Sequence, residues 1–203
     1  LVVLFYAIYL VVRNGTISYQ KASGLAMFSG IVIFCFYSFI RLKEMLPVEE
    51  YGYDAIFFIL LILCFAWGGD TCAYFAGRAF GKHKLCPVVS PKKTVEGAVG
   101  GVLGTMVFGV LVTVIYSIAA DRMEEFTRSN IGVSMYVIIA LLACVAAVLG
   151  IYGDLFASVV KRQCGIKDYG TIFPGHGGIL DRFDSVMFIA PFVTMVVIAA
   201  FYD

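Results

Sequence analysis

Charged residues are scarce in this 203-residue chain: they make up 14% of it, whereas hydrophobic residues make up 61%. A soluble domain normally carries about a quarter charged residues. The shortage of charge, together with several long apolar runs, excludes an ordinary soluble globule and predicts a polytopic membrane protein. The net charge is only +1, so the chain also lacks the basic surface that nucleic-acid binding requires.

Several familiar motifs are missing as well. The six cysteines include no CxxC pair, which argues against a thiolate metal site or a disulfide framework. There is no GxxxxGK[ST] loop and no GxGxxG unit, so a bound nucleotide would be held by a different design. The chain begins inside an apolar run without a basic leader, and we therefore expect a fragment with earlier spans missing rather than a signal peptide.

What the chain does have is a series of apolar segments. A helix needs about 20 apolar residues to cross a bilayer, and its backbone groups must be satisfied within the segment. We therefore predict an all-α transmembrane bundle, a single membrane domain over 1–203. We expect residues 1–66 to form peripheral spans and residues 67–203 to form the core of the domain, which carries its polar blocks. The expected segments are a remnant at Leu1–Val12 and five spans at Ala22–Ile40, Ala55–Trp67 (short enough to be broken or tilted), Val95–Ala120, Val133–Val160 and Phe183–Tyr202.

Basic residues are distributed unequally between alternate loops. Loops 13–21, 78–93 and 161–182 carry 2, 5 and 4 Lys/Arg, whereas loops 41–52 and 121–132 carry 2 each. The positive-inside bias therefore predicts that the first three loops are cytoplasmic.

The block from Ser158 to Asp184 is charged and glycine-rich, although it lies between two apolar segments. Ionisable groups at the mouth of a span are costly, so they usually serve chemistry. Cations can hold phosphates and carboxylates can hold a divalent metal. The predicted site residues here are Ser158, Lys161, Arg162, Lys167, Asp168, His176, Asp181, Arg182 and Asp184. For His176 only a phosphate contact or a turn-fixing role is expected.

A carboxylate inside the preceding span extends this group. Gly150, Asp154, Ser158 and Lys161 recur at helical spacing and share one face. We predict that Asp154 and Asp181 share one or two divalent cations, with magnesium or manganese favoured by the oxygen ligands. Two alternatives stay open: Asp154 pairs structurally with a lysine of a neighbouring helix, or the carboxylates near residue 181 cap a helix.

A second polar block precedes the long span that begins at Val95. Its predicted substrate-binding residues are Asp70, Ser90, Lys93, Thr94 and Glu96. Thr94 and the amide groups after it would form an anion site at a helix start, with Lys93 beside it. Lys92 is interpreted as a positive-inside anchor.

Four glycines in the same span, Gly97, Gly100, Gly101 and Gly104, form two GxxxG spacings. Such faces usually serve close helix packing, within a subunit or between two.

These residues carry a resemblance to a known family. The block Ser158, Lys161-Arg162, Lys167-Asp168, Gly170, Pro174, His176-Gly177-Gly178, Asp181-Arg182 and Asp184 resembles, without a departure, the signature of the CDP-diacylglycerol synthases, or phosphatidate cytidylyltransferases. The earlier block, from Asp70 to Gly97, is similar to another stretch of that family. The resemblance covers roughly Trp67 to the C-terminus, and residues 1–66 match only as spans.

The resemblance implies a reaction and a setting. CTP and phosphatidic acid would give CDP-diacylglycerol and pyrophosphate with Mg²⁺, held by Asp154 and Asp181. Lys161 and Arg162 would act with them as catalytic residues. The site would be a polar cavity at the cytoplasmic face of a bacterial cell membrane, open sideways to lipid, in a homodimer.

Two rival functions remain at this point. The nearer is another CTP-dependent lipid enzyme, such as a polyprenol or phytol kinase or an ether-lipid cytidylyltransferase. The more distant is an ion-coupled transporter, which would be expected to spread its charges through the bilayer depth rather than to gather them at one end.

Overall fold

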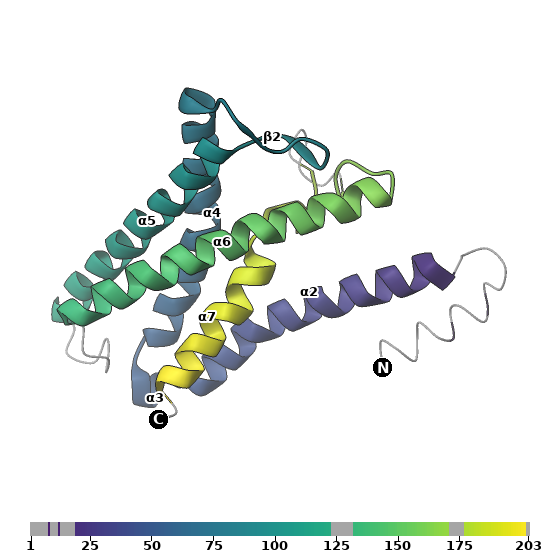
Figure 1. Ribbon diagram of the computed structural model, residues 1–203. Helices are drawn as coiled ribbons and strands as arrows, with labels where there is room; N and C mark the ends of the chain where they lie inside the picture. Colours follow the sequence, from purple (N-terminus) through teal and green to yellow (C-terminus); the bar gives the residue numbers. More distant parts are fainter. Residues whose placement is uncertain (1–7, 9–11, 13–18, 123–131, 171–176, 202–203) are drawn as a thin grey trace.

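The computed structural model describes residues 8, 12, 19–122, 132–170 and 177–201. It is an all-helical bundle with one small hairpin (Figure 1). In chain order the elements are α2 (Tyr19–Met45), α3 (Val48–Tyr51), α4 (Asp54–Phe80), β1 (Lys84–Cys86), β2 (Ser90–Thr94), α5 (Val95–Arg122), α6 (Val133–Gln163), the 3-10 turn η1 (Leu180–Arg182) and α7 (Val186–Phe201).

Four of the described helices are long and apolar enough to cross a membrane. They cover Ala26–Met45, Asp54–Phe80, Val95–Arg122 and Val133–Gln163. With 16 residues, α7 is shorter, and at about 1.5 Å per residue it extends for about 24 Å. The predicted polytopic bundle is thus confirmed. The last span begins three residues later than predicted, because residues 183–185 form a turn between the 3-10 turn η1 and α7.

The helix α4 differs most from the prediction. The segment expected to end at Trp67 continues to Phe80, straight through Gly68-Gly69-Asp70. The two glycines stay helical because α5 lies against them: a Cβ at Gly68 would meet the Phe108 ring at 2.9 Å, and one at Gly69 would meet Thr105 Oγ1 at 2.5 Å. Tight packing therefore outweighs the low helix propensity of glycine here.

Helix α5 has two unlike faces. Small residues at four-residue steps are buried against α4 and α6: Gly97, Gly101, Thr105, Gly109 and Thr113. The opposite face exposes large apolar residues at the same spacing: Val99, Leu103, Val107, Leu111 and Ile115. An apolar stripe this long suits contact with lipid rather than with water.

The glycine face serves packing within the chain. A Cβ added at Gly100 would lie 2.2 Å from the Ala76 Cβ, and one at Gly104 would lie 2.3 Å from the Cys72 Cβ. Of the two alternatives for the GxxxG spacings, packing within the subunit is therefore confirmed.

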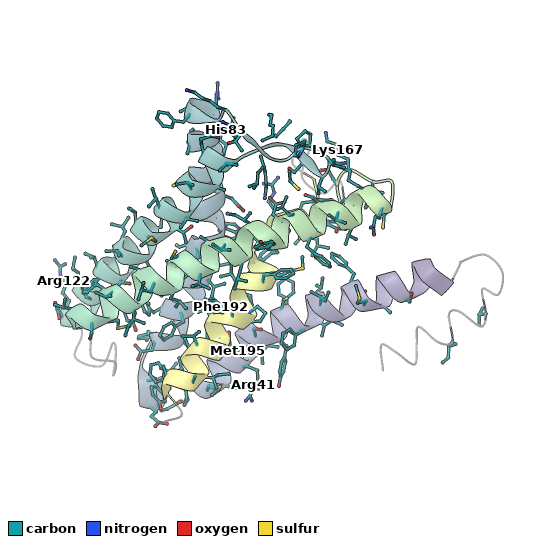
Figure 2. The ribbon with its side chains drawn as sticks, viewed as in Figure 1. Arg41, His83, Arg122, Lys167, Phe192 and Met195 are labelled. Carbon is teal, nitrogen blue, oxygen red and sulfur yellow. The ribbon has the colours of Figure 1, made fainter. Side chains whose placement is uncertain are left out.

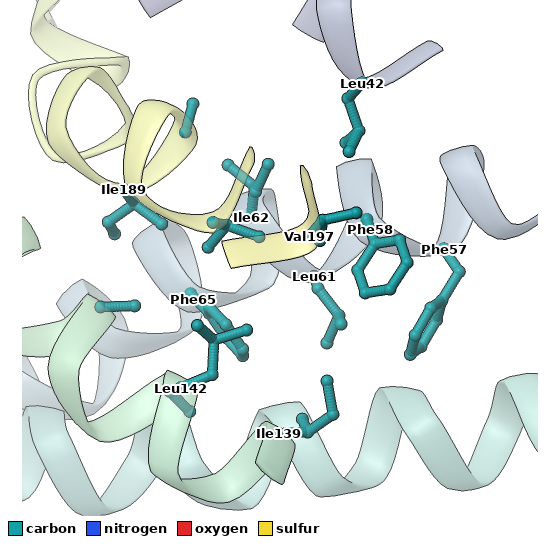
Figure 3. Packing of buried hydrophobic residues seen from close by; sticks show 14 of the residues in the cluster. Leu42, Phe57, Phe58, Leu61, Ile62, Phe65, Ile139, Leu142, Ile189 and Val197 are labelled. Atoms are coloured by element: carbon teal, nitrogen blue, oxygen red, sulfur yellow. The ribbon is translucent and has the colours of Figure 1, made fainter. Parts of the chain in front are cut away.

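The core lies between α4, α6 and α7 (Figure 3). Phe57, Leu61 and Phe65 of α4 are almost fully buried, and the picture shows them between Ile189 and Val197 of α7 on one side and Ile139 and Leu142 of α6 on the other. Figure 1 shows α2 running alongside α7. Between membrane helices, such contacts stabilise through close packing rather than through release of water.

The two polar blocks of the sequence lie at the same end of the bundle. The antiparallel hairpin β1–β2 joins the end of α4 to the start of α5, and the segment after α6 returns beside it. Figure 2 labels His83 and Lys167 at this end and Arg122 at the other end of α5. The fold thus brings together residues that are about 100 positions apart.

Candidate active site

A cavity of about 460 Å³ opens at this polar end, within the size range of pockets that bind small molecules. The C-terminal half of α4, β2, the first turn of α5, α6 and the η1 segment all contribute to it. Its lining consists of Asp70, Ala73, Tyr74, Gly77, Arg78, Leu85, Lys92, Lys93, Thr94, Gly97, Ala98, Ile151, Asp154, Asp181 and Asp184.

Asp154 lies in the last third of α6 and is paired with a lysine. Its Oδ2 is 2.5 Å from Lys93 Nζ, and its Oδ1 accepts a hydrogen bond from Ser158 Oγ at 3.4 Å. The structural alternative for Asp154 had named a lysine of a neighbouring helix, whereas Lys93 belongs to β2. This ion pair ties the hairpin to α6 across the cavity.

Asp181 is the most heavily bonded carboxylate of the site. Lys161 Nζ donates to its Oδ1 at 2.9 Å, and the backbone N–H groups of Tyr169 and Gly178 donate to its Oδ2 at 2.8 and 2.9 Å. Burial acts to raise the pKa of Asp181, but these three donors outweigh it and hold that pKa below its usual range. Asp181 is therefore ionised throughout the physiological pH range.

The loop that donates to Asp181 is built on glycine. Gly177 has a φ of +83°, and a Cβ there would lie 2.9 Å from Asp181 Oδ2. Only glycine fits both the backbone angle and the space. The backbone at Gly177-Gly178 therefore depends on glycine.

The ring of Tyr169 connects this loop to the rest of the bundle. Lys161 Nζ lies 5.3 Å from the ring centroid, and the Tyr169 hydroxyl donates to the Ala157 carbonyl at 3.0 Å. On its other side the ring stacks on Phe28 of α2, with centroids 5.3 Å apart. The sequence carried no sign of this role, since an aromatic residue between two polar blocks has many uses.

Asp70 and Asp184 are linked by a serine. Ser185 Oγ donates to Asp70 Oδ2 at 3.0 Å, and the Ser185 N–H donates to Asp184 Oδ1 at 2.9 Å. Neither carboxylate has a cationic side chain within 4.0 Å among the residues that the structure describes. Two carboxyl groups thus line the cavity without an ion-pair partner among the described residues.

Other predicted residues fall outside the cavity. Arg162 is exposed in the last turn of α6, Lys167 and Asp168 are exposed after that helix, and Ser90 begins β2. Arg182 is exposed, and its backbone carbonyl accepts a hydrogen bond from Trp67 Nε1 at 3.0 Å. His176 lies outside the described residues.

Glu96 was predicted to bind substrate, and that role stays a prediction. It is not among the residues that line this cavity; it lies on the hairpin side, with a side chain that is 26% exposed. Its carboxylate accepts the N–H groups of Lys82 and His83 and lies 2.6 Å from His83 Nδ1. In this arrangement Glu96 fastens the start of the hairpin.

Thr94 is buried at the cavity wall, and one of the backbone N–H groups after it is not free. The Gly97 N–H donates to Thr94 Oγ1 at 3.1 Å, so the hydroxyl caps the helix. The anion site predicted at this helix start is therefore partly used by the protein itself.

Three lining residues with polar or charged side chains were not among the predicted site residues: Tyr74, Arg78 and Lys92. The four-residue spacing of Asp70, Tyr74 and Arg78 was a usable signal, because it places them on one helix face. Lys92 lines the cavity beside Lys93, so its interpretation as a membrane anchor is incomplete.

The described residues contain no group of three or more His, Cys, Asp or Glu side chains close enough to hold a metal ion. Asp154 and Asp181 do line one cavity, but each is paired with a different lysine. The metal shared between them stays a prediction.

Known proteins resemble the chain along most of its length. The model of the cytidylyltransferase family matches residues 1–200, which extends the likeness beyond the part recognised from Trp67 onward. The phosphatidate cytidylyltransferase of Bacillus subtilis is 33% identical over 191 residues, covering 94% of this chain and 64% of that protein. Those of Staphylococcus haemolyticus and Staphylococcus epidermidis are 39% and 42% identical over 145 residues, covering 71% of this chain and half of each protein.

The chain thus spans between half and about two thirds of the length of these curated relatives. The family match covers nearly every residue, and the cavity gathers lysines and carboxylates from both blocks that carry the resemblance. This chain belongs to the cytidylyltransferase family.

Proposed function

We propose that this chain transfers a cytidylyl group from CTP to phosphatidic acid, giving CDP-diacylglycerol and pyrophosphate. One observation carries the proposal: a single cavity at the polar end of a membrane bundle holds four carboxylates together with lysines. The name of the relatives, phosphatidate cytidylyltransferase, supplies the substrate class. We also propose that the cavity faces the cytoplasm, as the loop charges favour, and that the chain acts as a homodimer.

The donor set of the cavity fits Mg²⁺. Oxygen ligands from carboxylates are what this ion prefers, and Asp70 and Asp184 face the cavity without a cationic partner among the described residues. We propose Asp154 and Asp181 as ligands, with Asp70 and Asp184 beside them, in a site for one or two cations. Bound Mg²⁺ would supply positive charge to the phosphate oxygens of the reactants.

The reaction depends on positioning of the two reactants more than on proton transfer. A phosphate oxygen of phosphatidic acid attacks the α-phosphorus of CTP, and pyrophosphate leaves in line. The second pKa of a phosphomonoester is about 6, so the nucleophile is ionised near pH 7 and needs no strong base. The reactants repel each other, and the task of the protein is to neutralise and align them. Lys93 and Lys161 supply charge at fixed positions, since each is held by a carboxylate.

The decisive experiment is a product assay on the purified full chain in lipid. Radiolabelled CTP and phosphatidic acid should give a labelled CDP-lipid and pyrophosphate on thin-layer separation. A labelled CDP product with a newly phosphorylated lipid would instead establish a kinase. Ion flux in vesicles without CTP would establish a transporter.

Variants test the assignment of the carboxylates. Asp154→Asn and Asp181→Asn should each abolish turnover while the protein still inserts, because a neutral amide weakens cation binding. Asp121→Asn is the matched control, since Asp121 is exposed in the last turn of α5, away from the cavity. Near-normal turnover in either cavity variant would remove that residue from the proposed centre.

A further inference from the structure

The cationic side chains around the cavity are of two kinds. Lys93 and Lys161 are each tied to a carboxylate, Asp154 and Asp181, at 2.5 and 2.9 Å. Arg78 and Lys92 also belong to this end of the bundle and both line the cavity, yet neither has a carboxylate within 4.0 Å in the described part of the chain.

Arg78 is placed by helix geometry. It stands in the last turn of α4, where a cation is favoured by the helix dipole. Its Nη1 donates to the hydroxyl of Tyr74, one turn earlier, at 3.4 Å. A neutral hydroxyl at that distance leaves the charge of the guanidinium uncompensated. The remaining N–H donors form the planar fork that suits a phosphate group.

Lys92 reaches the same cavity from another element. It lies in β2, next to Lys93, whose ion pair with Asp154 ties the hairpin to α6. That ion pair fixes the strand, and Lys92 is carried with it to the cavity wall. The strand and the end of α4 thus bring two uncompensated positive charges to one cavity.

We propose that Arg78 and Lys92 form a phosphate subsite that binds the two terminal phosphates of the nucleoside triphosphate, which leave as pyrophosphate. Among the described residues, neither cation forms an ion pair with Asp70 or Asp184, the carboxylates that line the cavity without cationic partners. Both cations are exposed to solvent, from which a nucleotide arrives, whereas the Lys93–Asp154 pair is about three-quarters buried. This inference rests on the proposed function, which supplies the nucleotide.

The experiment compares Arg78→Ala and Lys92→Ala with two matched controls. Lys84→Ala removes an exposed lysine of the same hairpin, and Arg122→Ala removes an exposed arginine at the far end of α5. Neither control residue lines the cavity. Two readouts are needed: the KM values for CTP and for phosphatidic acid in the full reaction, and equilibrium binding of radiolabelled pyrophosphate without lipid substrate.

Each cavity variant should raise the KM for CTP about tenfold or more, because a charge-assisted hydrogen bond to phosphate is lost. The Kd for pyrophosphate should rise in parallel, while the KM for phosphatidic acid and both controls stay within about twofold. Arg78→Lys should fall between the wild type and Arg78→Ala, since it keeps the charge but loses the fork.

Three outcomes would overturn the proposal. The first is unchanged CTP and pyrophosphate parameters in both variants of an active enzyme. The second is a rise confined to phosphatidic acid, which would assign the subsite to the lipid headgroup. The third is a wild-type chain that binds no pyrophosphate. Pyrophosphate binding that depends on Arg78 and Lys92 in a chain without turnover would keep the subsite and reject the proposed function.

Discussion

Replacing Lys161 by methionine tests how the candidate site is held together. Lys161 and Asp181 form an ion pair at 2.9 Å, with side chains only 11% and 8% exposed. Methionine keeps much of the length of the lysine side chain but removes the charge. Of the donors that the structure describes, Asp181 would then keep the backbone N–H groups of Tyr169 and Gly178.

The expected loss of stability can be worked from this geometry. Removing one partner of a buried pair costs about 3–5 kcal/mol, because the other charge is left uncompensated. The pair borders a cavity rather than the apolar core, so the lower end of that range applies, about 3 kcal/mol. For a chain of this size, this corresponds to a fall in Tm of about 6–12 °C.

The difference in Tm between wild type and variant should also depend on pH, in a direction set by the pKa of Asp181. In the wild type the pKa of Asp181 is lowered, so its stabilising contribution is complete above the unfolded value of about 4 and is lost as the pH falls below it. Without Lys161, burial acts with less opposition and the pKa of Asp181 rises. As the pH falls from 8 to 5, Asp181 therefore becomes protonated in the variant before it does in the wild type. Protonation removes the unpaired charge, so the difference in Tm between wild type and variant should become smaller over this range.

Thermal unfolding in lipid nanodiscs across that pH range provides the measurement, with Lys84→Met as the control for loss of a lysine. The double variant Lys161→Met/Asp181→Asn should recover part of the lost stability, because no unpaired charge remains. A gap below about 2 °C, or one that does not change with pH, would refute the role given to this pair.

Other predictions concern packing, a distant polar contact and the cation. Gly104→Val should lower Tm or prevent insertion, because even a Cβ would lie 2.3 Å from that of Cys72, whereas Gly30→Ala has nothing within 4 Å and should be tolerated; equal effects would contradict the packing of α4 on α5. Tyr116→Phe should cost about 1.5–3 kcal/mol in thermal unfolding, because it removes a buried 2.7 Å hydrogen bond to Asp54, and an unchanged Tm would count against that contact. Chelation with EDTA should stop CDP-lipid formation, and added Mg²⁺ should restore it; turnover in excess chelator would contradict the proposed centre.

The sequence predicted the architecture well, because hydrophobic length is a strong signal in membrane proteins. The main error of the prediction also came from hydrophobic length. Gly68-Gly69-Asp70 interrupts the apolar run, and a pattern of hydropathy alone places a helix end there. What keeps α4 helical is Thr105 and Phe108 of α5, a tertiary contact that no local window contains.

The site was predicted in part for a similar reason. Charge type and spacing identified Asp70, Lys93, Asp154, Asp181 and Asp184, all of which line the cavity. Spacing does not state which way a side chain turns once the chain leaves a helix. Glu96 therefore fastens the hairpin instead of joining the cavity. The small hairpin itself was missed, because the strand Ser90–Thr94 lacks the alternation of polar and apolar residues that predicts strands.

The close seam between α4 and α5 limits how this protein can move. Sliding one helix past the other by a single residue would press the Cα-bound carbons of Cys72 and Ala76 into the backbone of α5, since only glycine fits opposite them. The two helices therefore behave as one rigid unit, in which the distance between Asp70 and Thr94 stays constant. Any widening of the cavity that admits a lipid must come from movement of the other helices relative to α4 and α5. Cross-links between α4 and α5 should therefore leave turnover intact.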